Sequence, residues 1–103
     1  MNYKTIINKE NTIYKIVRTI NLNGENFQLP PNCTLDFQGG TIINGTINMN
    51  NTKILPQGCV IEDYITASIK GHYIIGQCFF DKNINKPKWW TGDKWVDATG
   101  IQV

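Results

Sequence analysis

Short apolar runs alternate with Thr and Asn through the middle of the chain. β-Branched residues dominate the apolar positions, and Gly or Asn interrupts almost every stretch, so the periodicity of a long helix does not develop. The pattern instead predicts very short strands joined by tight turns, and therefore an all-β fold. The expected strands of this region are 34–37, 41–44, 46–49 and 52–55.

Two segments near the middle of the chain resemble each other. Residues 29–36 read LPPNCTLD and residues 55–62 read LPQGCVIE, so Cys33 recurs 26 positions later as Cys59. A repeat of this length, filled with short strands, is typical of one turn of a parallel β-solenoid, because each turn must bring the chain back beneath its own start.

This register would stack like residues on one another. It places Cys33 beneath Cys59, and Leu35 beneath Ile61, in apolar columns. Asn side chains at the turns can form ladders of amide hydrogen bonds between successive turns of the chain. The candidates for these turn positions are Asn44, Asn48 and Asn51.

The predicted solenoid is very short. Roughly two turns fit between Ile20 and Tyr64, so both ends are expected to be open and to expose backbone edges and apolar surface. Association with copies of the same chain would bury that surface. The sequence therefore predicts a body over residues 20–70 that depends on self-association, preceded by a polar arm over 1–19 that is poorly ordered in isolation.

The C-terminal part, residues 71–103, is rich in aromatic residues and has a different pattern. Short alternating runs broken by Asn and Gly predict a small β-meander. Trp95 is expected to fold back over the strand that contains Phe79 and Phe80. The expected strands lie near 73–80, 88–90 and 94–97, with turns around 83–85 and 91–93.

Composition and charge exclude several classes of protein. The formal net charge is only +2, and 17% of residues are charged, so neither nucleic acid nor a membrane is expected as a partner. No apolar run is long enough to cross a bilayer, and residues 1–9 lack the apolar core of a signal peptide. Because Cys33, Cys59 and Cys78 show no CxxC spacing, we expect buried reduced thiols rather than a disulfide framework or a zinc site.

Candidate catalytic residues are sparse. His72 has no Ser or Cys nucleophile motif near it, which gives a catalytic triad little support. Asp36 and Glu62 lie one turn apart in the expected register, but so short a solenoid offers no groove to hold a sugar chain beside them. The Glu62-Asp63 pair is too sparse for a calcium loop. We therefore expect no enzymatic activity, no cofactor and no metal.

The candidate site residues are the tryptophans Trp89, Trp90 and Trp95. Exposed tryptophans stack on sugar rings, whereas buried ones anchor subunit interfaces. Because successive residues of a strand point to opposite faces, Trp89 and Trp90 are expected on opposite faces. Packing in the core and between subunits is the favoured interpretation, and contact with a capsid, tail, receptor or glycan partner is the alternative.

Two stretches of the chain resemble structural proteins of phages and prophages of gut Bacteroidales. The first runs from NTIYKI at 11–16 through PNCTLDFQGG at 31–40 to NGTI at 44–47, and it is similar to the opening turns of pectate-lyase-like β-helix spike proteins. The second, from IGQCFFD at 75–81 through NKPKWWTGDKWVDATG at 85–100, resembles a module that closes head-fibre, tail-fibre and appendage chains of such phages, including the crAss-like type.

This resemblance implies a non-catalytic component of the virion, a subunit of a head-fibre or tail-fibre appendage built as an intertwined parallel homotrimer. The expected partners are copies of the chain and other virion proteins, such as capsid or tail proteins. The alternative function is a glycan- or receptor-binding tip that uses the tryptophan cluster on a host surface glycan. The implied parts are an attachment arm (1–19), a short β-solenoid body (20–70) and an aromatic β-module (71–103).

Overall fold

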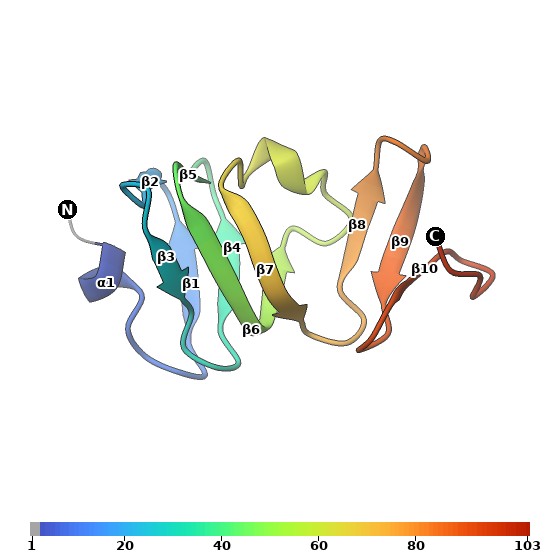
Figure 1. Cartoon of the computed structure of the whole chain (residues 1–103), viewed down its shortest axis with the longest axis horizontal. Coiled ribbons are helices and arrows are strands. Elements are labelled where there is room, and N and C mark those ends of the chain that lie inside the picture. Colours follow the sequence, from blue (N-terminus) through green and yellow to red (C-terminus); the bar gives the residue numbers. More distant parts are fainter. Residues whose placement is uncertain (1–2) are drawn as a thin grey trace.

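The computed structural model describes residues 3–103, which form short strands almost throughout (Figure 1). In chain order the elements are α1 (Tyr3–Ile6), β1 (Ile13–Ile16), β2 (Thr19–Asn21), β3 (Asn26–Gln28), β4 (Thr34–Phe37), β5 (Thr41–Ile43), β6 (Thr46–Leu55), the 3₁₀ turn η1 (Ile61–Asp63), β7 (Ser68–Tyr73), β8 (Cys78–Asp81), β9 (Lys86–Trp90) and β10 (Trp95–Val96).

Strands β1 to β7 stack in parallel ladders. Ladder A holds β1, β4 and the end of β6; ladder B holds β2, β5 and the bridge residue Ile65; ladder C holds β3, the start of β6, and β7. Partner residues are between 19 positions apart, as for Thr34 and Lys53, and 23 positions apart, as for Ile42 and Ile65. The chain therefore returns beneath its own start after each set of short strands.

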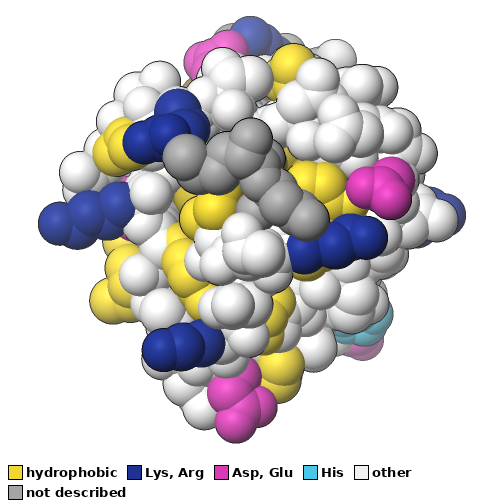
Figure 2. All heavy atoms as spheres, turned by 90° about the vertical axis from the view of Figure 1, so that its left-hand side faces the viewer, with side chains coloured by type: hydrophobic (Ala, Val, Ile, Leu, Met, Phe, Trp, Pro, Cys, Tyr) yellow, Lys and Arg dark blue, Asp and Glu magenta, His cyan; other side chains and the backbone are white. Residues whose placement is uncertain are grey.

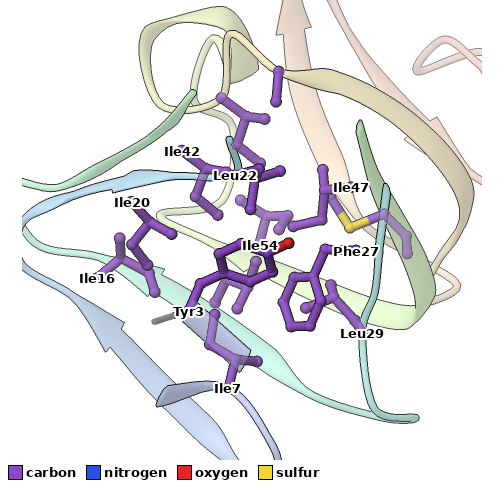
Figure 3. Close-up of a cluster of buried hydrophobic side chains, with 14 of the residues drawn as sticks. Tyr3, Ile7, Ile16, Ile20, Leu22, Phe27, Leu29, Ile42, Ile47 and Ile54 are labelled. Carbon is purple, nitrogen blue, oxygen red and sulfur yellow. The ribbon is translucent and has the colours of Figure 1, made fainter. Parts of the chain in front are cut away.

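Inward-facing side chains of each ladder form an apolar column, because alternate residues of a strand point to the same face. Ile42, Ile47 and Ile54 are at most 1% exposed and point into a shared core (Figure 3). Outward positions carry mainly Thr, Asn, Ser and Lys. The columns are Tyr14, Leu35 and Ile54 in ladder A, Ile20, Ile42 and Ile65 in ladder B, and Phe27, Ile47 and Ile69 in ladder C.

The expected register of 26 residues is wrong. Leu35 pairs with Ile54 and not with Ile61. The reason is that β6 continues as one strand through the corner at Asn51, where φ is 50°. The chain therefore reaches ladder A again after fewer residues than the repeat of Leu-Pro sequences suggested.

The expected column of cysteines is also absent from the described residues. The Cys33 carbonyl accepts a hydrogen bond from the Lys53 N–H at 3.0 Å, so Cys33 lies beside the end of β6. Cys59 instead lies beside β8, where its carbonyl accepts from the Phe80 N–H at 3.0 Å. The similar sequences around these two cysteines therefore occupy different places in the fold.

Asn residues occupy the corners of the stack. Asn11, Asn32 and Asn51 each precede a strand segment of ladder A and have positive φ angles of 53°, 60° and 50°. Asn tolerates this left-handed conformation better than other residues with a side chain. The predicted turn at Asn44, where φ is 59°, is confirmed. Asn48 and Asn51 both lie within β6; Asn51 forms a bulged corner of that strand, whereas Asn48 is an ordinary strand residue and its prediction is wrong.

Helix α1 covers the first edge of ladder C. Tyr3 and Ile7 are each 2% exposed, and the Tyr3 ring packs edge-on against Phe27 of β3 with centroids 4.7 Å apart. The Tyr3 hydroxyl donates to Glu25 Oε1 at 2.7 Å. This hydrogen bond raises the pKa of Tyr3 to about 12. The short helix is thus held by both apolar and polar contacts.

Much of the expected N-terminal arm belongs to the packed body. Tyr3, Ile7 and Ile16 are buried in the core, and β1 pairs with β4 along its whole length. The expectation of poor order is therefore wrong for residues 3–16, because their apolar side chains complete the core. Residues 1–2 of the arm lie outside the described residues.

Gln77 closes the far end of ladder A. Its side chain is fully buried, and its Oε1 accepts from the Ile54 N–H at 2.7 Å while its Nε2 donates to the Ile54 carbonyl at 3.1 Å. The Nε2 group also donates to Gln57 Oε1 at 3.3 Å and to the Cys78 carbonyl at 3.2 Å. Because Ile54 pairs with Leu35 on its other side, the Gln77 amide takes the place of a further strand.

The two ends of the stack are thus partly closed within a single chain. Helix α1 covers ladder C at the N-terminal end, and Gln77 covers ladder A at the C-terminal end. Each of these two edges therefore has contacts within the chain, while the dependence of the body on association with other copies stays a prediction.

Strands β8, β9 and β10 form the antiparallel meander that the sequence predicts. Its turns contain Asn85 with φ 56° and Gly92 with φ 110°, conformations that favour these residue types. The strand expected near 73–80 is divided, because β7 belongs to ladder C and β8 to the meander. The molecule measures 43 × 24 × 22 Å, with α1 and the meander at opposite ends (Figure 1).

Candidate functional site

Trp95 lies at the centre of an aromatic cluster that joins the meander to the body. Its ring centroid is 5.4 Å from Tyr73, 5.7 Å from Phe79 and 5.3 Å from Trp90. Tyr73 belongs to β7, and the other rings belong to the meander. The predicted contact of Trp95 with the strand that contains Phe79 is therefore confirmed.

Lys88 extends this cluster with a charge. Its Nζ lies 4.7 Å from the Trp95 ring centroid and 3.1 Å from Asp81 Oδ2. The pKa of Asp81 is lowered, first by the Asn83 N–H and then by Lys88. The ion pair holds the ammonium group over the indole, where the negative face of the ring attracts it.

Trp89 and Trp90 point to opposite faces of β9. Trp90 is paired with Trp95, whereas Trp89 is paired with Val96 on the other face. The face of β9 that carries Trp90 is turned toward the body. There the His72 ring lies edge-on to the Trp90 ring, with the ring centroids 5.6 Å apart. The structure therefore brings Trp90 and Trp95 together and separates Trp89 from both.

Trp90 contributes contact area rather than polar recognition. Its indole N–H is buried and has no hydrogen-bond acceptor within residues 3–103. A buried donor without an acceptor lowers the stability of the fold. Trp90 therefore stabilises this position through the apolar packing of its ring. The inner face of the meander is thus a packing surface.

Trp89 lines an open hollow on the outer face. This hollow has a volume of about 400 Å³ and is lined by Trp89, Val96, Asp97, Ala98 and Gly100. The lining combines the Trp89 side chain with the loop that follows β10. All three candidate tryptophans are half-buried, and Trp89 is the one that lines this hollow.

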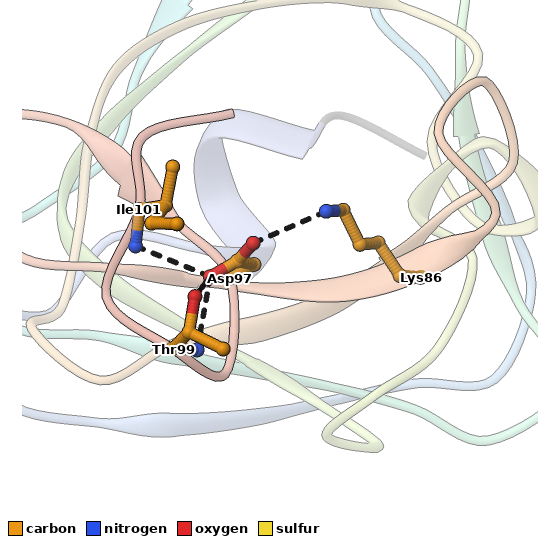
Figure 4. Close-up of polar contacts among 4 residues, drawn as sticks. All are labelled: Lys86, Asp97, Thr99 and Ile101. Atoms are coloured by element: carbon orange, nitrogen blue, oxygen red, sulfur yellow. Dashed lines mark hydrogen bonds and ion pairs between the residues drawn. The ribbon is translucent and has the colours of Figure 1, made fainter.

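Asp97 fixes the loop that forms this wall (Figure 4). Its Oδ1 accepts from the Thr99 hydroxyl at 2.6 Å, from the Thr99 N–H at 2.9 Å and from the Ile101 N–H at 3.1 Å. Its Oδ2 lies 3.1 Å from Lys86 Nζ. These partners, led by the Thr99 hydroxyl, hold the pKa of Asp97 well below its usual value. The carboxylate is therefore a structural group whose oxygens are already engaged.

The other candidate groups are dispersed. Asp36 pairs with Leu55 in ladder A, whereas Glu62 lies in η1, so the structure does not place the two carboxylates in register. His72 is exposed on β7. Across residues 3–103, no group of three or more His, Cys, Asp or Glu side chains is arranged to hold a metal ion. No helix in that range is long and apolar enough to cross a membrane.

The three cysteines are unpaired within residues 3–103, and the predicted burial holds for Cys33 but not for Cys59 and Cys78. Cys33 is buried, and Cys59 and Cys78 are half-buried. Burial raises the pKa of Cys59 to about 11 and also raises the pKa of Cys78. Both thiols are therefore protonated and weakly nucleophilic near neutral pH.

Sequence reasoning missed Gln77 and Asp97. A polar residue between the apolar pairs Ile74-Ile75 and Phe79-Phe80 was a signal for Gln77, since a polar side chain inside an apolar run needs a buried partner. The sequence Asp-Ala-Thr-Gly at 97–100 was a signal for a side-chain-capped turn.

No protein-family model, curated protein or solved structure matches this chain. A functional proposal must therefore be supported by the chain's own sequence and geometry.

Proposed function

We propose that this chain is a non-catalytic structural protein of a bacteriophage particle, a subunit of a head-fibre or tail-fibre appendage. The observation that supports the proposal is the order of parts along the long axis. A stack of parallel strands is followed by an aromatic meander, which lies within the stretch that resembles the closing module of phage fibre chains. An elongated unit of 43 × 24 × 22 Å suits such an appendage.

In this proposal the parallel ladders are a short β-helix, and the subunit works as a homotrimer. Stacked columns of like residues are what a β-helix uses to bury a continuous core. Lateral contacts would join the three copies, since parts of both ends are already covered. Exposed apolar side chains, which favour association, include Ile13 at 65%, Ile75 at 73% and Ile101 at 65% exposure.

Location on the particle is tested with antibodies against the purified chain. They are applied to intact particles of the phage or prophage that encodes it, and labelling is located by electron microscopy. Label on the capsid is the favoured result and assigns a head fibre, while label on the tail assigns a tail fibre. Absence of the chain from purified particles by mass spectrometry would contradict the proposal.

The oligomeric state is tested by native mass spectrometry of the isolated chain at micromolar concentration. A trimer is expected. A folded monomer as the sole species would contradict the homotrimer while leaving the particle test to decide on the virion role.

The alternative function is a glycan- or receptor-binding tip, and the open hollow beside Trp89 is the observation that favours it. The half-buried Trp89 indole would offer its accessible apolar face to a sugar ring. A glycan array distinguishes the two functions. Binding that is lost in Trp89→Ala, with an unchanged melting temperature, would favour the tip, and absence of binding by the parent chain would favour the purely structural role.

A further inference from the structure

Within residues 3–103, the first strand of each ladder (β1, β2 or β3) has no strand paired to its outer edge. The edge of β2 is the one that has hollows beside all of its residues. In the parallel pair of β2 and β5, the Leu22 N–H donates to the Ile43 carbonyl at 2.9 Å. Alternate residues of a paired strand turn their backbone groups to opposite sides, so Thr19 and Asn21 direct their N–H and C=O groups away from β5. Neither N–H has a hydrogen-bond partner in the part of the chain from Tyr3 to Val103.

Two hollows lie along this edge. Their volumes are about 270 Å³ and about 180 Å³, and both are lined by Ile6 of α1 and by Arg18 and Ile20. One extends along the chain to Lys15 and the other to Asn23, so the hollows adjoin the whole of β2. Figure 2 looks onto this end of the molecule, where apolar side chains reach the surface between Lys and Arg side chains.

This combination is what an added strand requires. Unpaired backbone groups supply hydrogen bonds to a second backbone, and hollows beside the edge accept its side chains. The neighbouring edge of β3 lacks this combination, because no residue of β3 lines either hollow. The far edge of ladder A lacks it as well, because the Gln77 amide is bonded to Ile54 there.

The charges around the two hollows indicate which kind of added strand would bind there. The two hollows are lined by the cationic residues Lys15 and Arg18 and by no carboxylate. Their remaining lining is apolar or uncharged, with Ile6, Ile16, Val17 and Ile20 as the apolar part. A segment in which apolar residues alternate with acidic ones would therefore match both the hollows and their rim.

We propose that the edge of β2 binds an extended segment of another polypeptide in which apolar and acidic residues alternate. The bound segment adds a strand to ladder B beside Thr19 and Asn21. Binding itself does not depend on the proposed virion function. If the chain is an appendage subunit, this edge is the end that attaches to another virion protein, and that identification does rest on the proposed function.

The probe is a blocked octapeptide of alternating valine and glutamate, added to the isotopically labelled full chain. We expect a dissociation constant below about 1 mM, with NMR shifts centred on Thr19 and Asn21 and slower hydrogen exchange at their amides. A valine and lysine peptide should bind at least about tenfold more weakly, because the rim is cationic. A valine and glutamate peptide N-methylated along one edge should not bind.

Matched variants test the geometry in the chain itself. Thr19→Pro removes an outward N–H and should abolish binding, whereas Thr19→Val keeps it and should bind like the parent. Lys15→Glu should weaken binding about tenfold, whereas Lys53→Glu, on another strand of ladder A, should not.

No binding of the parent up to millimolar peptide would overturn the proposal, as would equal binding by folded Thr19→Pro. If Thr19→Pro does not fold, the test is the binding of the N-methylated peptide to the parent chain. Binding of that peptide with the same affinity as the unmethylated peptide would overturn the proposal. These tests use the isolated chain, so their failure is distinguishable from absence of the chain in phage particles.

Discussion

The two ends of the strand stack are finished in different ways. At the C-terminal end, the buried Gln77 amide pairs with Ile54, and the aromatic cluster around Trp95 packs on β7. At the N-terminal end, Tyr3 of α1 packs on Phe27 of β3, and within residues 3–103 no strand pairs with the outer edge of β2. A stack of parallel strands has no natural end, so each edge must be covered by a side chain, a helix or a partner.

The difference separates stability from binding. The C-terminal end holds the aromatic contacts of Trp95 and the Gln77–Ile54 hydrogen bonds, so substitutions there should lower the free energy of unfolding. The N-terminal end has the outer edge of β2 beside two hollows, so substitutions there should change binding and leave folding nearly intact.

Trp95→Ala should have the largest effect. The ring contacts Tyr73, Phe79 and Trp90, and its loss should cost about 3–5 kcal/mol. This is comparable to the whole stability of a small domain, so loss of soluble or assembled protein is expected in thermal melts and light scattering. Lys94→Ala, at an exposed position, should change stability by no more than about 0.5 kcal/mol.

The opposite result for Trp95 would change the role of the meander. If Trp95→Ala melted like the parent and kept its oligomeric state but lost attachment or glycan binding, the inner face would be a recognition surface. The structural interpretation of the aromatic cluster would then be wrong.

Gln77→Leu should have the second largest effect. Leucine fills a similar volume but leaves the Ile54 N–H and C=O buried without their partner. We expect a loss of about 2–4 kcal/mol from these two groups, measured by urea denaturation. The matched control is Gln28→Leu, because Gln28 is exposed and its hydrogen bonds are 3.3 and 3.5 Å long. Equal costs for the two substitutions would refute the capping role of Gln77.

Asn32→Ala should have a smaller effect that comes from the backbone. Asn32 has φ 60° at a corner of the stack, and a left-handed conformation costs a residue such as alanine about 1–2 kcal/mol. Asn32→Gly should lose less, since glycine adopts this conformation freely. Asn26→Ala, at an exposed position within β3, is the control. A melting temperature unchanged by Asn32→Ala would show that the corner relaxes without strain.

The smallest predicted effect concerns acid stability. The pKa of folded Asp97 is lowered from 3.8 by the Thr99 hydroxyl and Lys86, so its stabilising contribution is present above pH 3.8 and lost as pH falls through the folded pKa. The melting temperature should therefore fall between about pH 4 and pH 2. Asp97→Asn should reduce this slope, whereas Asp93→Asn should not. Parallel pH profiles of Asp97→Asn and the parent would contradict the role of Asp97.

Local features of this fold could be predicted from the sequence. The strand Thr34–Phe37 was predicted with its observed bounds, because Gly and Asn punctuate this region. The opposite orientations of Trp89 and Trp90 follow from strand alternation alone. The meander also follows from its turns at Asn85 and Gly92.

Features that depend on contacts between distant segments could not be predicted. The 26-residue register failed because pairing of Leu35 with Ile54 is set by the shape of β6 at its corner, and not by similar turn sequences. Gln77 was missed because its partner is the backbone of Ile54, which has no sequence signature.

The central claim, that the Gln77 amide caps ladder A while the outer edge of β2 is unpaired within residues 3–103, is tested most directly by residue-resolved amide hydrogen exchange on the isolated chain. The Ile54 N–H, bonded to the Gln77 side chain at 2.7 Å, should be as protected as the Ile42 N–H, which bonds to the Tyr64 carbonyl at 2.9 Å. The Thr19 and Asn21 amides should exchange at close to unprotected rates. Protection of Thr19 and Asn21 equal to that of Ile54 would contradict the account.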